Sequence, residues 1–125
     1  MYLVDTNIFL EILLQQKRSQ DCKDFLHNNT GELNLTDFSI HSIGVILFRE
    51  NEDNLFSKFL TDTLPKVHLI SLPKSQYKEV IQNRKNLKLD FDDAYQYSVC
   101  KHYGFKLTTM DQDFKNVKDI EIVFL

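Results

Sequence analysis

The sequence predicts a three-layer α/β/α domain with a central, mainly parallel sheet of four to five strands. Short apolar runs that fit strands alternate along the whole chain with longer segments whose apolar residues recur at three- and four-residue spacing, the pattern of amphipathic helices. Strands that alternate with helices typically form a parallel sheet covered on both faces. No internal repeat or linker divides the sequence, so we expect residues 1–125 to form one domain.

The first half of the chain begins with a short apolar run. Leu3 and Val4 fit a buried strand that ends at Asp5, and the apolar residues from Ile8 to Leu14 are too dense for strict alternation and long enough for a helix. The other elements predicted here are a helix over Ser19–Asn28 ended by Gly31, a strand over Glu32–Leu35, a helix capped by Thr36 that carries Ile40, Ile43, Leu47 and Phe48, and a helix over Asn54–Leu64 stopped by Pro65.

The second half continues the alternation. Val67–Leu72 fits a strand, and Pro73 precedes a predicted helix over Lys74–Asn86. Asp90 opens the next helix, and Gly104 is a fitting C-terminal stop for it. One face of this helix is expected to carry Phe91, Ala94, Tyr95, Ser98, Val99 and His102, and the chain then continues with a strand over Phe105–Thr108, a helical turn over Asp111–Phe114 and a strand over Ile120–Phe124.

Composition narrows the class of protein. Hydrophobic residues make up 42% and charged residues 26%, as in soluble globular domains. The net charge of -3 argues against a nucleic-acid binder that relies on overall charge. No apolar run approaches the roughly 20 residues of a membrane-spanning helix, and no secretory signal is evident. Cys22 and Cys100 show no disulfide or metal-binding pattern, so we expect a cytoplasmic protein with no membrane contact.

Acidic residues lie near predicted strand ends and helix starts. Asp5 follows the first strand and Asp111 follows the fourth, and parallel sheets bind ligands beyond the carboxyl ends of their strands. Asp90 and Asp93 are three residues apart on a predicted helix and therefore neighbours on its surface. The remaining members of this acidic set are Asp37, Asp92 and Asp113.

Crowded carboxylates repel one another unless a cation neutralises them, and oxygen ligands suit Mg²⁺ or Mn²⁺. Such an ion polarises a phosphoryl oxygen and activates water for in-line attack, so the acidic set predicts metal-dependent phosphodiester hydrolysis. The alternative is helix capping, because Asp5, Asp111 and the pair Asp90 and Asp93 stand where Asp commonly caps helices. Spacing alone leaves both interpretations open.

Three motifs, DTNIFLE, LDFDDAYQYSVCKHYG and LTTMDQDF, follow one another along the chain. Together they resemble the PIN domain family, the fold of the VapC-like toxin ribonucleases of type II toxin–antitoxin systems. The resemblance spans essentially the whole chain. It implies a metal-dependent endoribonuclease with RNA as substrate, and it makes a protein antitoxin and a second copy of the chain candidate partners.

The resemblance also implies roles for individual residues. Asp5, Asp93 and Asp111 match metal-binding acids of the family and would be the catalytic residues. Asp113 matches an accessory acid, and Asp90 occupies a position where many members have none. Both are expected helpers at the metal. Thr6, Asn7 and Thr109 match polar residues that support these carboxylates by hydrogen bonds, as groups behind a metal site generally do.

One departure from the family pattern affects this interpretation. The family normally has a Glu about six residues beyond a Ser or Thr in the helix after the second strand; counted from Thr36, that position is Ser42, beside His41. Either Asp90 or Asp113 compensates, or His41 joins the site as a ligand, phosphate contact or proton carrier, or catalysis is weak. A module that binds RNA or a protein partner is therefore an alternative function, and a structure-specific DNA nuclease is a third hypothesis.

A local excess of basic residues precedes the second acidic motif. Only Glu79 opposes the bases of this segment, which are Lys74, Lys78, Arg84, Lys85 and Lys88. They would hold RNA phosphates, or they form an ordinary solvated helix face.

Tyrosines are candidates for stacking on unpaired bases, or are core and rim residues: Tyr77, Tyr95, Tyr97 and Tyr103. An apolar group suggests core or a dimer surface: Leu55, Phe56, Phe59 and Leu60.

Overall fold

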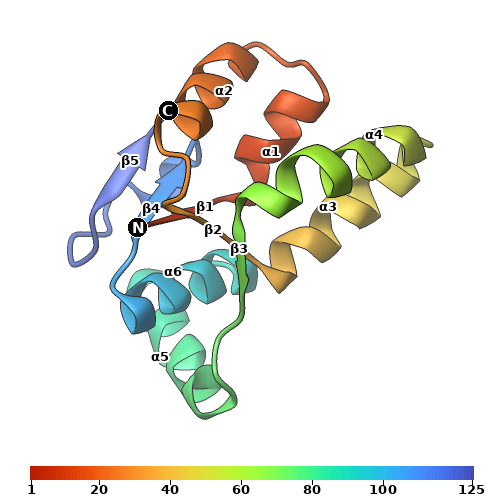
Figure 1. Ribbon diagram of the computed structural model, residues 1–125. Coiled ribbons are helices and arrows are strands. Elements are labelled where there is room, and N and C mark those ends of the chain that lie inside the picture. The colour runs from red at the N-terminus through yellow and green to blue at the C-terminus, as the bar shows by residue number, and fades with distance from the viewer.

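A computed structural model describes residues 1–125 and confirms the predicted α/β/α architecture (Figure 1). Its five strands form one sheet in the order β3-β2-β1-β4-β5, and every neighbouring pair is parallel. The strands are β1 (Tyr2–Val4), β2 (Leu33–Thr36), β3 (His68–Ile70), β4 (Lys106–Thr109) and β5 (Ile122–Phe124).

The strand order reverses at the centre of the sheet. The chain builds outward from β1 to β2 and β3, and then returns to the other side of β1 to form β4 and β5. Val4 is paired with Thr108, and the backbone N–H of Asp5 donates to the carbonyl of Thr108 at 2.9 Å. Residues that follow β1 and β4 therefore meet at the point where doubly wound sheets bind ligands.

Helices cover both faces of the sheet (Figure 1). On one face, α6 (Phe91–Tyr103) packs against the sheet and α5 (Tyr77–Leu87) packs against α6, and the buried core there includes Leu3 and Leu107. The opposite face, which includes Val4, packs against α1 (Thr6–Leu13), α2 (Ser19–Asn28) and α3 (Asp37–Arg49). Leu3 and Val4 belong to different cores because successive side chains of a strand point to opposite faces.

The segment Asn54–Leu64 is helical, as predicted, but it is not one regular α-helix. α4 (Asp53–Lys58) leads into a π-helical turn, η1 (Phe59–Thr63), and a 3₁₀ turn, η2 (Leu64–Lys66). Pro65 lies inside η2 rather than beyond the helix, because proline is tolerated in the first turn, where no N–H partner is needed. Phe48, predicted on the inner stripe of α3, is 59% exposed and packs edge-on against Phe56 instead.

α6 corrects the prediction of a single buried face. Its residues from Asp93 to Cys100 are all buried, since the helix lies between the sheet and α5, whereas Phe91 and His102 are exposed. Gly104 ends α6 with a φ of 72°, as predicted.

The segment before α5 begins as a 3₁₀ turn, η3 (Lys74–Gln76), and the turn after β4 is η4 (Gln112–Phe114). None of the helices combines the length and apolar character needed to cross a lipid bilayer.

Candidate metal centre

A pocket of about 260 Å³ opens at the carboxyl edge of β1 and β4. Segments far apart in the sequence contribute to it: the start of α1, one side of α3, the first turns of α6 and η4. Six aspartates line it, namely Asp5, Asp90, Asp92, Asp93, Asp111 and Asp113. Asp5, Asp93 and Asp111, which the sequence marked as the central acids, are thus brought to one place.

Asp5 is buried and held rigidly. Its Oδ1 accepts a hydrogen bond from the backbone N–H of Thr6 at 2.8 Å, and its Oδ2 accepts one from Thr109 Oγ1 at 2.7 Å. Burial raises the pKa of Asp5, the two hydrogen bonds lower it, and the nearby charge of Asp111 raises it again. Thr109 Oγ1 also accepts a hydrogen bond from the backbone N–H of Asp111 at 2.9 Å, so one hydroxyl links two of the acids.

The environment of Asp93 disfavours the charged form of its carboxyl group. Its side chain projects from the first turn of α6 and the residue is only 8% exposed. Burial raises its pKa to about 7, and the negative charges of Asp92, Asp111, Asp5 and Asp113 act in the same direction. A carboxyl group with this pKa in a pocket marks a candidate functional site.

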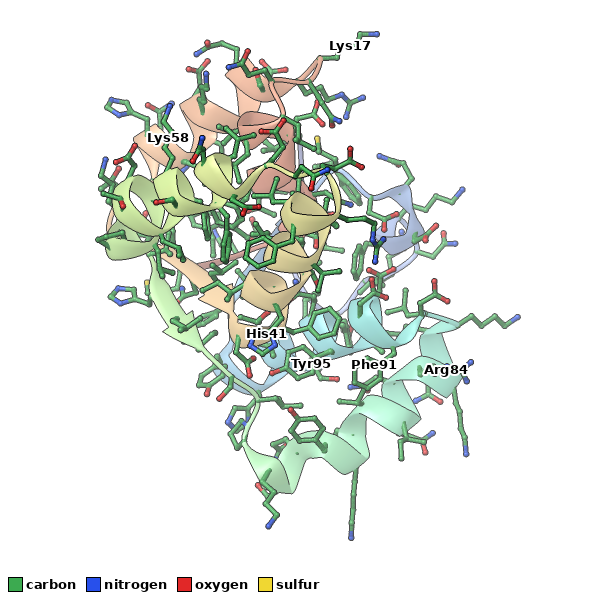
Figure 2. The ribbon with its side chains drawn as sticks, turned by 90° about the vertical axis from the view of Figure 1, so that its right-hand side faces the viewer. Lys17, His41, Lys58, Arg84, Phe91 and Tyr95 are labelled. Carbon is green, nitrogen blue, oxygen red and sulfur yellow. The ribbon has the colours of Figure 1, made fainter.

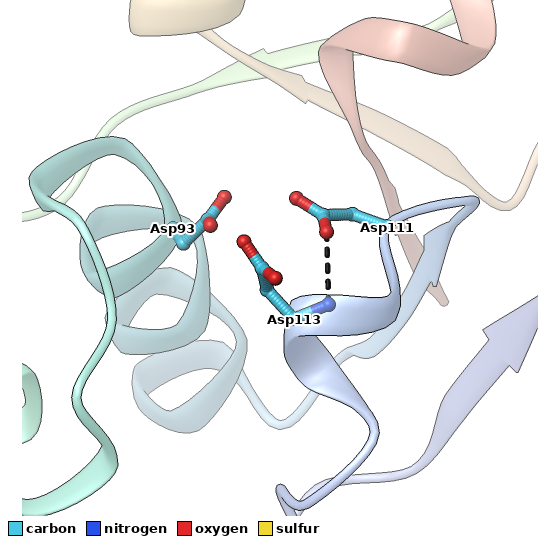
Figure 3. A group of neighbouring side chains, drawn as sticks. All are labelled: Asp93, Asp111 and Asp113. Carbon is cyan, nitrogen blue, oxygen red and sulfur yellow. Dashed lines mark hydrogen bonds between the residues drawn. The ribbon is translucent and has the colours of Figure 1, made fainter.

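Three of the carboxylates converge closely (Figure 3). Asp93, Asp111 and Asp113 each offer an oxygen, and these oxygens lie within 4.8 Å of one another. The backbone N–H of Asp113 donates to Asp111 Oδ1 at 2.9 Å, which fixes the turn that carries both residues. The two ion pairs of the structure, Lys101–Asp119 and Lys106–Glu121, involve none of the residues that line the pocket. A set of hard oxygen donors without a protein cation fits Mg²⁺ or Mn²⁺.

Capping and site formation are compatible at two positions. The side chains of Asp5 and Asp111 accept backbone hydrogen bonds at the starts of α1 and η4, and both residues line the pocket. Asp90 stands at the N-cap of α6, but its side chain makes no capping hydrogen bond, so helix capping does not account for this residue. Asp90 and Asp92 are exposed at the pocket rim.

The expected supporting residues differ in what they do. Thr109 supports Asp5 through its hydroxyl, whereas Thr6 does so through its backbone N–H and directs its own hydroxyl to Ser39 Oγ at 2.8 Å. Asn7 lines the pocket as an exposed residue. Ser42, where the family pattern expects a Glu, also lines the pocket, while its neighbour His41 is exposed and does not (Figure 2).

A polar layer beneath the acids was missed by sequence reasoning. Ser39 Oγ lies 3.1 Å from Thr36 Oγ1 and accepts a hydrogen bond from Gln96 Nε2 at 2.9 Å, and both Ser39 and Gln96 are buried. Gln96 also lines the acidic pocket. The signal that could have found it is its position three residues after Asp93, on the same face of α6.

The basic residues lie beside the acidic pocket rather than in it. Arg84 and Lys85 line a second, largely apolar groove of about 460 Å³, together with Tyr77, Val80, Ile81 and Phe91. This groove runs between α5 and the start of α6, where Figure 2 shows Arg84 and Phe91. Lys74, Lys78 and Lys88 are exposed on or next to α5. Two of the tyrosines considered for stacking, Tyr95 and Tyr97, are instead buried core residues.

Comparison with known proteins places this arrangement in a family. The PIN domain model matches residues 2–120. The chain belongs to the PIN domain family. No curated protein sequence matches the chain at a significant level.

Solved structures share this PIN fold. VapC20 from Mycobacterium tuberculosis, described as a toxin that cleaves the sarcin-ricin loop, has 14% sequence identity and a TM-score of 0.80, covering 98% of this chain and 99% of VapC20. A toxin–antitoxin complex from Klebsiella pneumoniae has 17% identity and a TM-score of 0.77, covering 96% and 95% of the two chains. VapBC2 from Rickettsia felis, bound to a promoter DNA fragment, has 13% identity and a TM-score of 0.77, covering 97% and 96%.

Proposed function

We propose that this PIN domain, taken as a single unit over residues 1–125, is a metal-dependent endoribonuclease and the toxin of a toxin–antitoxin pair in the cytoplasm. The observation that carries the proposal is the convergence of Asp5, Asp93 and Asp111 in a pocket that no Lys or Arg lines. Such a concentration of negative charge is unfavourable in the free protein and becomes favourable when a divalent cation is bound.

Each acid has a distinct part in this proposal. Asp93, Asp111 and Asp113 would hold Mg²⁺ or Mn²⁺, with Asp5 beside them and Asp90 at the rim. The ion would supply polarisation of a phosphoryl oxygen and a more acidic water. Asp5 keeps its orientation through Thr109 and Thr6. Because its pKa is raised to about 7, Asp93 is partly protonated in the cation-free protein at neutral pH and would release its proton as the cation binds.

RNA as the substrate is supported by the groove beside the acids. Phe91 lies between the pocket residues Asp90 and Asp92 and is 53% exposed. Arg84 and Lys85 border it in the groove, and neither forms an ion pair within the protein. An unpaired base stacked on Phe91, with its phosphate held by Arg84 or Lys85, would lead the strand toward the acids. Lys74, Lys78 and Lys88 would extend the phosphate contacts along α5.

A protein partner is the second part of the proposal. One similar structure, from Klebsiella pneumoniae, is a toxin–antitoxin complex. This chain exposes apolar side chains on α3 and at η1: Val45 is 54%, Phe48 59% and Leu60 39% exposed. Exposed apolar patches of this kind often mark interaction sites. We therefore propose that an antitoxin covers this surface, with a second copy of the chain as the alternative partner.

A binding module without efficient catalysis is the competing function, and the observation that favours it is Ser42. The residue lines the pocket from α3, where the family pattern places a carboxylate. A PIN fold that holds RNA or a protein partner would need the basic groove and the apolar surface but not a complete set of acids.

The two functions are separated by cleavage assays with the purified protein. Single-stranded RNA, tRNA and flapped DNA are incubated with Mn²⁺ or Mg²⁺, with chelator as the reference. We expect cleavage of RNA only, lost with chelator and abolished by Asp5→Asn and by Asp93→Asn, while circular dichroism shows an unchanged fold. Cleavage that persists in either variant would remove the metal mechanism. Binding of RNA without any cleavage would favour the module, and preferential cutting of flapped DNA would favour a DNA nuclease.

A further inference from the structure

Gln96 carries a buried oxygen without a partner at the acidic pocket. The residue is 2% exposed and lines the pocket from α6. Its Nε2 donates to Ser39 Oγ at 2.9 Å, whereas its Oε1 accepts no hydrogen bond. Buried acceptors are nearly always satisfied, and leaving one unsatisfied costs about 1–3 kcal/mol. Because Gln96 lines a polar pocket, its unsatisfied amide oxygen is expected to meet a ligand there.

The orientation of the amide is fixed from behind. Ser39, which accepts from Nε2, is itself anchored, because its backbone N–H donates to Thr36 Oγ1 at 3.0 Å. Thr6 Oγ1 donates to Ser39 Oγ at 2.8 Å, so the starts of α1 and α3 meet at this hydroxyl. With the amide nitrogen hydrogen-bonded to Ser39, the orientation of the amide group is fixed, and Gln96 itself lines the pocket.

The charge of the pocket favours a neutral oxygen at this place. Six aspartates already line it, and their mutual repulsion contributes to the raised pKa of Asp93. A further carboxylate would add to that repulsion, whereas an amide carbonyl adds an oxygen donor without charge. Carbonyl oxygens, including those of Gln amides, are suitable ligands for hard divalent cations. Ser42, which lines the same pocket, presents no carboxylate, so it does not supply the donor that the family pattern places there.

We propose that Gln96 Oε1 is a neutral oxygen donor to the hydrated divalent cation of this pocket and takes the place of the carboxylate that is missing at Ser42. The inference rests on the proposed function, since it requires that the pocket binds a divalent cation. It predicts that an oxygen donor on the side chain at position 96, and not the size of that side chain, determines how tightly the cation is held.

The test is calorimetric titration of the intact chain with Mn²⁺ at one pH. Gln96→Met keeps an unbranched side chain of similar length but removes the amide oxygen. We expect it to weaken Mn²⁺ binding by about tenfold or more. Gln96→Glu, which retains an oxygen donor, is expected to bind Mn²⁺ at least as tightly as the parent chain. The matched control is Gln82→Met, on the exposed surface of α5, which should bind as the parent does.

A purely structural role for Gln96 gives a different pattern. In that case Gln96→Glu would weaken binding as much as Gln96→Met does, because neither variant keeps the amide N–H that donates to Ser39. That pattern would overturn the inference, as would an unchanged affinity in Gln96→Met. If the parent chain itself binds no Mn²⁺ at millimolar concentration, the proposed metal-dependent function fails, and the inference fails with it.

Discussion

The surroundings of Asp93 and Asp119 shift the pKa values of these two aspartates in opposite directions. Asp119 accepts a hydrogen bond from the Tyr97 hydroxyl and lies 3.1 Å from Lys101 Nζ, and these contacts lower its pKa. Asp93 is buried among other carboxylates, and its pKa is raised to about 7. Asp119 shows how this fold stabilises a carboxylate with a structural role.

The difference teaches where to look for function in an acidic protein. Asp119 is paired by residues of its own chain, so its charge is already satisfied. Asp93 and its neighbours keep an unfavourable arrangement that only a ligand from outside can relieve, and such local exceptions to stable design are typical of functional sites. The net charge of -3 hides this contrast, because five basic residues are gathered in or next to α5, beside the acids.

The largest expected effect is on RNA cleavage by matched Asp→Asn substitutions. Asp93→Asn removes a proposed metal ligand and should lower the rate by at least about a hundredfold, since metal stabilisation of the reacting phosphate contributes several kcal/mol. Asp119→Asn removes the same charge far from the pocket and should leave the rate within about twofold. Initial rates with single-stranded RNA and saturating Mn²⁺ measure both. Equal losses in the two variants would contradict a special role for the pocket.

The next effect is on the pH dependence of stability in cation-free protein. An unfolded Asp titrates near pH 3.9, whereas folded Asp93 titrates at about 7. Between these values the folded state binds more protons, so the free energy of unfolding falls as pH rises through this range and stays low above it. Allowing for solvent screening, we expect Asp93 to account for a loss of about 1–3 kcal/mol.

Urea denaturation at about pH 4.5 and pH 7.5, followed by circular dichroism, measures this loss. Asp93→Asn should have a smaller difference in stability between the two pH values than the parent chain, and Asp119→Asn should not reduce it. Adding Mn²⁺ at the higher pH should restore stability to the parent chain but much less to Asp93→Asn. Identical pH slopes for the parent and Asp93→Asn would show that the burial of Asp93 carries no such penalty.

A smaller effect is expected when the family's carboxylate is restored. Ser42→Glu adds an acid from α3 to the pocket, and we expect Mn²⁺ affinity to rise by about tenfold while cation-free protein loses stability through added repulsion. Ser57→Glu adds the same charge on the exposed surface of α4 and should change neither. Calorimetric titration measures the affinity. If Ser42→Glu binds Mn²⁺ no better than the parent, the existing aspartates and Gln96 already complete the site.

The sequence predicts most of the fold and the central acids for one physical reason. Parallel strands place their carboxyl ends at one edge, so residues just beyond the strand ends, such as Asp5 and Asp111, come together there if the strands are neighbours. Gly104 marks the end of α6 because its φ of 72° suits glycine. The first prediction uses a general property of parallel sheets, and the second uses only the local conformation of the chain.

The parts that failed depend on contacts between distant segments. α6 is buried on all sides through the middle of the helix, so apolar periodicity could not show which side faces the pocket. Gln96 and Ser39 are 57 residues apart, and no local pattern links them. His41 and Ser42 are adjacent, but neighbours on a helix point about 100° apart, and only the packing of α3 decides that Ser42 reaches the acids.

The smallest effect concerns the paired aspartate. Tyr97→Phe removes the hydroxyl that donates to Asp119 Oδ2 while keeping the aromatic ring that is buried in the core. Because the hydroxyl is the main cause of the lowered pKa of Asp119, that pKa should rise toward its ordinary value, with Lys101 retaining part of the shift. The loss of one hydrogen bond to a partly exposed carboxylate should lower the free energy of unfolding by about 0.5–1.5 kcal/mol.

Carboxyl chemical shifts followed through a pH titration report the pKa, and urea denaturation reports the stability. Mn²⁺ affinity should be unchanged, because Asp119 lies outside the acidic pocket; a change there would mean that the two acidic regions are coupled through α6, which carries both Tyr97 and Asp93.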